Sequence, residues 1–219
     1  MNYSYILEEK GLMIHIDSTI LNKYGNIKYN QIEYKIESYY SEYIKKMKAG
    51  IVMGMFDFLK GKGGDSDKKQ TLTSPANGKV IAIEEVDDPV FSQKMMGDGF
   101  GVVPNDGDVY APGSGKVVSV FPTQHAVGLE LDNGVEVLVH IGIDTVELEG
   151  APFDTLVKEG DTVTPDTKIS TVDLEALAAA GKENTVIIIF SNMEQVENFD
   201  LTTTGETTKG SEIGTISAK

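Results

Sequence analysis

The sequence of 219 residues contains no cysteine and no arginine. Without cysteine there is no disulfide, no thiol nucleophile and no thiolate metal site, which suits a reducing compartment, and we expect the cytoplasm. Lysine supplies all 19 cations against 34 acidic residues, so nucleic acid is an unsuitable partner for a chain of net charge −15. The longest apolar runs, such as 186–190, are far shorter than the roughly 20 residues that span a bilayer. We therefore expect no stable membrane insertion.

The composition changes near Met55. Residues 1–54 hold eight of the nine tyrosines and seven lysines against six acidic residues, whereas residues 55–219 hold 12 lysines against 28 acidic residues. We expect 1–54 to be a weakly ordered N-terminal extension, because so short a segment has no complementary apolar partner. A short apolar start and a flexible linker rich in Gly, Ser and charge follow at 55–72. The folded domain is then expected at 73–219.

Short alternating or β-branched segments, separated by turn residues, follow residue 73. This pattern predicts an all-β fold, an antiparallel β-sandwich or barrel-sandwich hybrid. Residues 75–83 resemble residues 112–120, which indicates an internal pseudo-repeat of two similar hairpins. The clearest strands are predicted at 79–83, 115–120, 127–131, 135–141 and 185–189.

One or two short helices complete the prediction. The segment 173–180 reads DLEALAAA, with Asp173 as the cap and Gly181 as the stop. A second helical turn is predicted at 152–158.

Two of the three histidines flank a predicted hairpin. His125 precedes and His140 ends two alternating segments around an Asp-Asn-Gly turn. A loop of residues 132 and 133 places the histidines opposite one another, and a loop of residues 133 and 134 makes them diagonal neighbours. Either register puts both imidazoles on one face of the sheet. Such a pair can bind a metal, act as a base with a helper, or provide a nucleophilic nitrogen with a second donor beside it.

The residues around both histidines resemble the active-site signature of the glucose-type enzyme IIA family of the bacterial phosphoenolpyruvate-dependent sugar phosphotransferase system. The resemblance extends over residues 73–219. Residues 55–60 also resemble the start of free-standing members, so we expect Met55 to be the physiological start. The matching motifs lie at 74–78, 88–99, 109–115, 121–129, 134–148, 158–161 and 191–193.

The resemblance implies a role for each matched residue. His140 matches the histidine that is phosphorylated on Nε2, and His125 matches the partner that hydrogen-bonds the phosphoryl oxygens. Gly142 matches the residue whose carbonyl accepts the Nδ1 proton of the phosphorylated histidine, and Thr123 adds a hydroxyl. The resemblance implies phosphoryl transfer through phosphohistidine, with phosphate accepted from phospho-HPr and passed to a cysteine of a IIB domain for sugar uptake. It also allows regulatory protein targets, and no cofactor is required.

A docking surface for protein partners is implied around the histidines. Four apolar residues match the rim of this surface. The alternative interpretation of each is that it belongs to the buried core. Two carboxylates match acidic groups beside the site, which would attract a basic partner. The rim residues are Val90, Phe91, Met96 and Phe121, and the carboxylates are Asp88 and Asp144.

Two other classes compete with this interpretation. A zinc hydrolase would use the H-x-x-x-D spacing of His140 and Asp144, but the H-x-H pair of lysostaphin-like endopeptidases is missing. We expect zinc only adventitiously, or at a partner interface that adds a ligand to His125 and His140. A lipoyl or biotinyl carrier would need an E-x-M-K-M pattern at a hairpin tip, which the sequence lacks.

Overall fold

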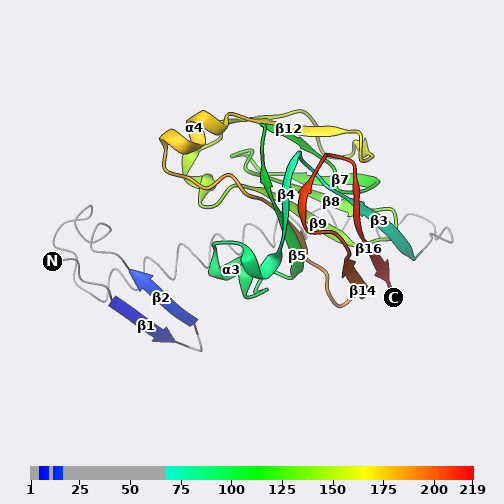
Figure 1. Cartoon of the computed structure of the whole chain (residues 1–219), viewed down its shortest axis with the longest axis horizontal. Helices are drawn as coiled ribbons and strands as arrows, with labels where there is room; N and C mark the ends of the chain where they lie inside the picture. The colour runs from blue at the N-terminus through cyan, green and yellow to red at the C-terminus, as the bar shows by residue number, and fades with distance from the viewer. Residues whose placement is uncertain (1–4, 10–11, 17–67) are drawn as a thin grey trace. The chain divides into compact units, whose positions relative to one another are not determined.

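The computed structural model describes residues 5–9, 12–16 and 68–219, with side chains for 68–219 only (Figure 1). The chain divides into two units, 1–49 and 50–219. In the first, β1 (Tyr5–Glu9) and β2 (Leu12–Ile16) form an antiparallel hairpin. The remainder of the expected extension, the apolar start and most of the linker lie outside the described residues, so the expectations for them stay predictions.

The second unit is built on an antiparallel sheet of eight strands, which confirms the predicted all-β class. The strand order is β11-β7-β8-β9-β13-β5-β4-β15. All five clearest predicted strands are present to within a residue or two. The strands are β4 (Gly78–Ala82), β5 (Asp98–Pro104), β7 (Gly115–Val120), β8 (Ala126–Leu131), β9 (Glu136–Ile141), β11 (Thr162–Val163), β13 (Val186–Phe190) and β15 (Gly205–Thr207).

The sheet order is symmetric about its centre, as the predicted pseudo-repeat requires. β7 pairs with β8 on one side and with the short β11 on the other, and β4 pairs in the same way with β5 and the short β15. The two strands of the repeat therefore occupy equivalent positions in the two halves. The centre lies between β9 and β13. The five apolar residues of β13 are buried throughout, as expected of a strand covered on both faces.

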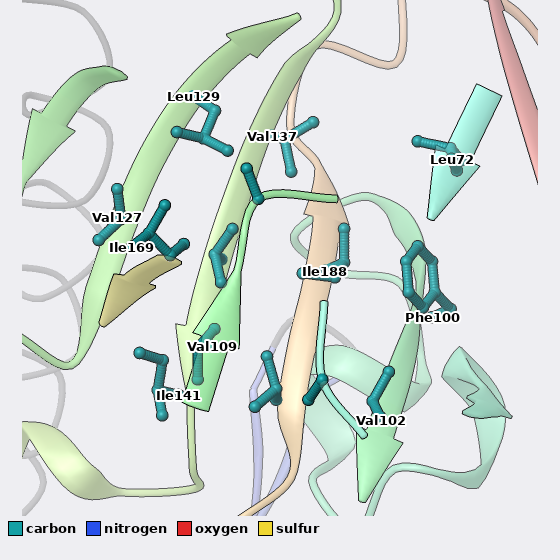
Figure 2. Close-up of a cluster of buried hydrophobic side chains, with 14 of the residues drawn as sticks. Leu72, Phe100, Val102, Val109, Val127, Leu129, Val137, Ile141, Ile169 and Ile188 are labelled. Atoms are coloured by element: carbon teal, nitrogen blue, oxygen red, sulfur yellow. The ribbon is translucent and has the colours of Figure 1, made fainter. Parts of the chain in front are cut away.

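Two sheets of three strands cover one face of the large sheet. Side chains from all three sheets meet in one apolar core, in which Val137 and Ile188 of the large sheet pack with Val109 and Ile169 of one small sheet and Leu72 of the other (Figure 2). This arrangement is the predicted sandwich. The first small sheet contains β10 (Phe153–Thr155), β12 (Lys168–Val172) and β6 (Asp108–Tyr110), and the second contains β14 (Val196–Leu201), β16 (Glu212–Ala218) and β3 (Lys69–Thr73).

The start of β3 corrects the expected domain boundary. The linker was predicted to run through residue 72, but residues 69–73 pair with β16. The partner of this strand lies at the far end of the chain, so no local turn signal marks the strand. Its composition alone is typical of a linker.

The helices agree with the prediction in one place and differ in another. α4 (Leu174–Ala179) is confirmed, with Asp173 accepting a hydrogen bond from the Ala176 backbone N–H at 2.9 Å. The helical turn predicted at 152–158 is wrong, because that segment contains β10, paired with β12. Within residues 68–219 the other α-helix is α3 (Pro89–Ser92), and this part of the chain also contains two short 3-10 turns, η1 (Ile83–Glu85) and η2 (Thr145–Leu148). Within the described residues, no helix has the length and apolar character needed to cross a membrane.

Candidate functional site

His140 lies near the end of β9, on the face of the large sheet that points away from the main core. Val139 and Ile141, its neighbours in the strand, belong to that core, so the alternation of a strand directs His140 to the opposite face. There its ring meets the Phe91 ring of α3, with centroids 5.1 Å apart. Only 2% of His140 is exposed.

The hairpin that leads to His140 has neither of the two expected registers. Its loop has three residues, 132–134, because Gly134 has a left-handed φ of 85° and the Leu131 N–H donates to the Val135 carbonyl. His140 consequently pairs with Ala126 rather than lying opposite or diagonal to His125. A regular strand in this register would send the two histidines to opposite faces.

The two imidazoles are nevertheless adjacent, with centroids 5.1 Å apart and planes at 79°. His125 precedes the first residue of β8 and follows Gln124, whose left-handed φ is 53°. The Ile141 N–H donates to the His125 carbonyl at 2.8 Å, so the backbone pairing with β9 reaches His125 and the chain departs from strand geometry at Gln124. The expected adjacency is correct, but the register argument that led to it is wrong.

Gln124 supports the loop that carries His125, a role that the sequence alone did not predict. Its side-chain carbonyl accepts a hydrogen bond from the Thr155 backbone N–H at 2.9 Å, which ties the histidine loop to β10. A left-handed φ is uncommon for a residue other than glycine or asparagine, and no local motif signals it. The conformation is stabilised by this tertiary bond and by a local hydrogen bond from the Gln124 backbone N–H to the Phe121 carbonyl at 2.8 Å.

Thr123 orients the His125 ring. Its hydroxyl oxygen lies 2.6 Å from His125 Nδ1, and the Phe121 ring lies at the edge of the same imidazole with centroids 5.4 Å apart. Nε2 of His125 has no hydrogen-bond partner among residues 68–219 and is buried. A buried polar atom without a partner can form a hydrogen bond with a ligand that reaches it.

Burial keeps both imidazoles neutral at neutral pH. Desolvation lowers the pKa of His125 from 6.5 to about 4. For His140, desolvation and the neighbouring His125 lower the pKa from 6.5 to about 3, against a smaller opposing effect of a hydrogen bond with the Gly142 backbone. A neutral imidazole has a lone pair on one nitrogen and can act as a nucleophile.

Gly142 makes the turn that follows His140. Its φ is 76°, and a Cβ at this position would lie 2.5 Å from Cγ2 of Thr145 and 2.7 Å from the carbonyl oxygen of Glu183. The Thr145 hydroxyl donates to the Ile141 carbonyl at 2.6 Å and closes the turn. Glycine is required here both by conformation and by space.

The two matched carboxylates lie near one another, Asp88 at the start of α3 and Asp144 in the turn after β9. Asp88 caps α3 by accepting hydrogen bonds from the Val90 and Phe91 backbone N–H groups at 2.7 and 3.3 Å. Burial raises the pKa of Asp88, and the nearby Asp144 charge raises it further. Asp144 is exposed and adopts a left-handed φ of 56° before η2.

The four expected rim residues do not form a uniform surface. Val90, Met96 and Phe121 are half-buried, whereas Phe91 is only 5% exposed and packs on His140. Met95, which the sequence analysis did not select, is 50% exposed next to Met96. Phe91 is therefore buried, as the alternative to a place on the docking rim predicts.

Residues 70–196 match the model of the family described as phosphoenolpyruvate-dependent sugar phosphotransferase system, EIIA 1. The chain belongs to this family. It is 44% identical over 156 residues to the glucose-specific EIIA component of Staphylococcus epidermidis, covering 71% of this chain and 94% of that protein.

Two further relatives extend the comparison. The glucose-specific EIICBA component of Streptococcus pneumoniae is 48% identical over 139 residues, which is 64% of this chain and 19% of that protein, so the chain spans about a fifth of its length. The solved glucose permease IIA of Mycoplasma capricolum superposes with a TM-score of 0.62 at 37% identity, covering 68% of this chain and 96% of that one. The predicted family and β-sandwich fold are confirmed.

Membership of the EIIA family confirms the predicted function class. The chain is a phosphohistidine carrier of the sugar phosphotransferase system and therefore a phosphoryl-transfer protein. The family implies HPr and a IIB domain as partners. Neither the zinc hydrolase nor the lipoyl or biotinyl carrier is supported. Residues 68–219 contain no group of three or more His, Asp or Glu side chains placed to hold a metal ion, and the expectation of adventitious or interfacial zinc stays a prediction.

Proposed function

We propose that His140 is the residue that accepts the phosphoryl group, from phospho-HPr, and that it passes this group to a cysteine of a IIB domain. The observation that carries the proposal is the pair of neutral imidazoles, 5.1 Å apart on the outer face of the sheet. His15, the third histidine, lies in the other unit of the chain, outside the family match. His140 is the better acceptor of the pair, because the Nδ1 of His125 is engaged by Thr123.

The transfer needs positioning rather than covalent assistance. The lone pair on Nε2 of His140 attacks phosphorus, the P–N bond of phospho-HPr breaks, and the donor imidazole leaves with its electron pair. We assign to His125 the tautomer in which the Thr123 hydroxyl donates to Nδ1 and the proton lies on Nε2, the atom that has no hydrogen-bond partner among residues 68–219. That N–H then donates to a phosphoryl oxygen on His140.

The acidic surroundings favour passing the group on. Asp88 and Asp144 lie near enough to affect one another, and both would repel the charge of a phosphoryl group. The same charges favour encounter with a basic partner. We therefore assign to Asp88 and Asp144 a role in partner approach, together with the half-buried Val90, Met96 and Phe121.

We further propose that the sugar is glucose and that the protein works in the cytoplasm. The glucose-specific relatives support the sugar, and the combined designation EIICBA of the pneumococcal relative supports association with IIB and IIC parts. Docking of the unphosphorylated protein to regulatory targets is a separate proposal, supported by the family resemblance alone.

The proposal is tested with the full chain, phosphoenolpyruvate, enzyme I and HPr, followed by a purified glucose-type IIB domain. We expect the wild type to take phosphate in the acid-labile, alkali-stable form of phosphohistidine, and His140→Ala to take none. His125→Gln should accept phosphate from HPr but pass it to IIB slowly. His15→Gln is the matched control and should behave as the wild type does.

Two results would contradict these assignments. Label on His140→Ala at the wild-type level would show that another residue accepts the group. Unchanged transfer from His125→Gln to IIB would remove the role given to His125, with that of His140 left intact.

A further inference from the structure

The phosphoryl acceptor is almost completely enclosed. His140 is 2% exposed and His125 is 1% exposed. An imidazole that exchanges a phosphoryl group with two different proteins must be reached by each of them. Some part of its enclosure therefore has to move during the reaction cycle.

Phe91 supplies one wall of the enclosure. Its ring is 5% exposed and contacts the His140 ring at 5.1 Å between centroids, with an angle of 57° between the planes. The other aromatic neighbour, Phe121, is half-buried and meets His125 instead. Phe91 is thus the aromatic side chain that covers the acceptor itself.

The backbone of the segment that bears Phe91, residues 88–97, is hydrogen-bonded within the segment and not to the sheet. The backbone N–H groups of residues 92, 93, 94, 95 and 97 all donate to carbonyls of residues 88–94, and the cap by Asp88 is internal as well. Lys94 attaches the segment to its surroundings by ion pairs with Glu84 and with Asp98 of β5. All three side chains are partly exposed. β9, in contrast, is hydrogen-bonded on both sides, to β8 and β13.

The C-terminal end of the segment contains two residues with unusual backbone angles. Lys94 has a left-handed φ of 58°, and Gly97 has a φ of 126°. Because no backbone hydrogen bond among the described residues joins the single turn of α3 to the large sheet, α3 can move without breaking the pairing of the sheet. Phe91 is its buried side chain. Segments held in this way open at a lower free energy than the sheet beside them.

We propose that Phe91 is a gating residue, which closes over His140 between transfers, keeps water from the phosphohistidine, and moves aside with α3 when a protein partner docks. This inference rests on the proposed function of His140. Hydrolysis would occur by attack of a water oxygen on phosphorus. The P–N bond would break, the water proton would pass to the ring nitrogen, and inorganic phosphate would leave. Excluding water at this point preserves the group for IIB.

Two probes that need no protein partner test the gate. Diethyl pyrocarbonate acylates neutral imidazole, and its reaction with His140 is followed by peptide mass spectrometry. Phosphoramidate donates its phosphoryl group as the P–N bond to ammonia breaks, and the lifetime of the resulting phosphohistidine is then measured. The variants are Phe91→Leu and Phe91→Ala, with Phe153→Leu as the control, because Phe153 is equally buried but lies in the main core.

We expect the acylation rate of His140 to rise from the wild type to Phe91→Leu to Phe91→Ala, by at least about tenfold over the series, equivalent to about 1.4 kcal/mol. The phosphohistidine lifetime should shorten in the same order. Phe153→Leu should lower stability and leave both rates at the wild-type level. If Phe91→Ala does not fold, the comparison of wild type with Phe91→Leu decides the question.

The outcomes separate the gate from the proposed function. Equal acylation rates in the wild type and the folded Phe91 variants would overturn the gate, even if HPr phosphorylates His140. Faster acylation of the variants, with no phosphoryl transfer from HPr to the wild type, would support the enclosure and overturn the carrier role of His140. Faster acylation with an unchanged phosphohistidine lifetime would overturn the water-shielding part of the proposal.

Discussion

Replacing His140 by glutamine should flatten the dependence of stability on pH. The pKa of His140 is about 3 in the folded protein, and that of His125 is about 4, against 6.5 for an ordinary histidine. Between about pH 6.5 and about pH 4 the unfolded chain binds protons at these positions and the folded protein does not. The free energy of unfolding therefore rises with pH in this interval and is lost as the pH falls.

The magnitude follows from proton linkage. One histidine that is charged only when unfolded contributes a slope of about 1.4 kcal/mol per pH unit, and two contribute about 3 kcal/mol per unit. A domain has a total stability of about 5–15 kcal/mol, so the effect is large. Burial raises the pKa values of Asp88, Glu130 and Glu136, which acts in the opposite direction at the acidic end.

Urea unfolding at a series of pH values measures the slope for the wild type, for His140→Gln and for His125→Gln. The carboxylates are common to all three proteins, so their contribution largely cancels in the differences. We expect each variant to lose about half of the histidine contribution, close to 1.4 kcal/mol per pH unit. Parallel curves for the wild type and His140→Gln would refute the conclusion that burial keeps this imidazole neutral.

Substitutions at four positions test the supports of the site. Gly142→Ala should lower the free energy of unfolding by about 2 kcal/mol or more in urea titrations, from steric overlap and backbone strain. Gly134→Ala, with a positive φ but open space around it, should cost only about 1 kcal/mol. Thr123→Val should slow transfer to IIB about threefold to tenfold, the value of one hydrogen bond to His125, and Thr123→Ser should restore it; equal rates for the two variants would contradict this role. Gln124→Gly, which keeps the left-handed turn, should retain more transfer activity than Gln124→Ala in the same assay.

The local pattern of the sequence was sufficient for the regular elements around the site. The strand that follows His125, the strand that carries His140 and the helix capped by Asp173 have periodicity, turn and cap signals within a few residues of one another. The strand at 69–73 and the strand at 153–155 lacked such signals. The first pairs with β16 near the far end of the chain, and the second pairs with β12. The local pattern predicts a linker at the first and a helical turn at the second, and both predictions are wrong.

The hairpin shows how a correct contact can follow from an incorrect register. A left-handed Gly134 adds one residue to the loop, and that single residue reverses which residues share a face. The histidines are adjacent nevertheless, at a point where Gln124 turns the chain before β8 and is tied to β10. This compensation involves an element remote from the hairpin and has no signature in its residues.

The sequence by itself determined the chemistry available to this protein: a chain without cysteine or arginine, an antiparallel β fold, and two histidines flanking one hairpin within a recognisable family pattern. The tertiary structure alone decided that α3 folds over His140 and that both imidazoles are desolvated. The physical reason is that burial, and the pKa values it shifts, depend on elements packed together from distant parts of the chain, whereas periodicity and turn chemistry are properties of neighbouring residues.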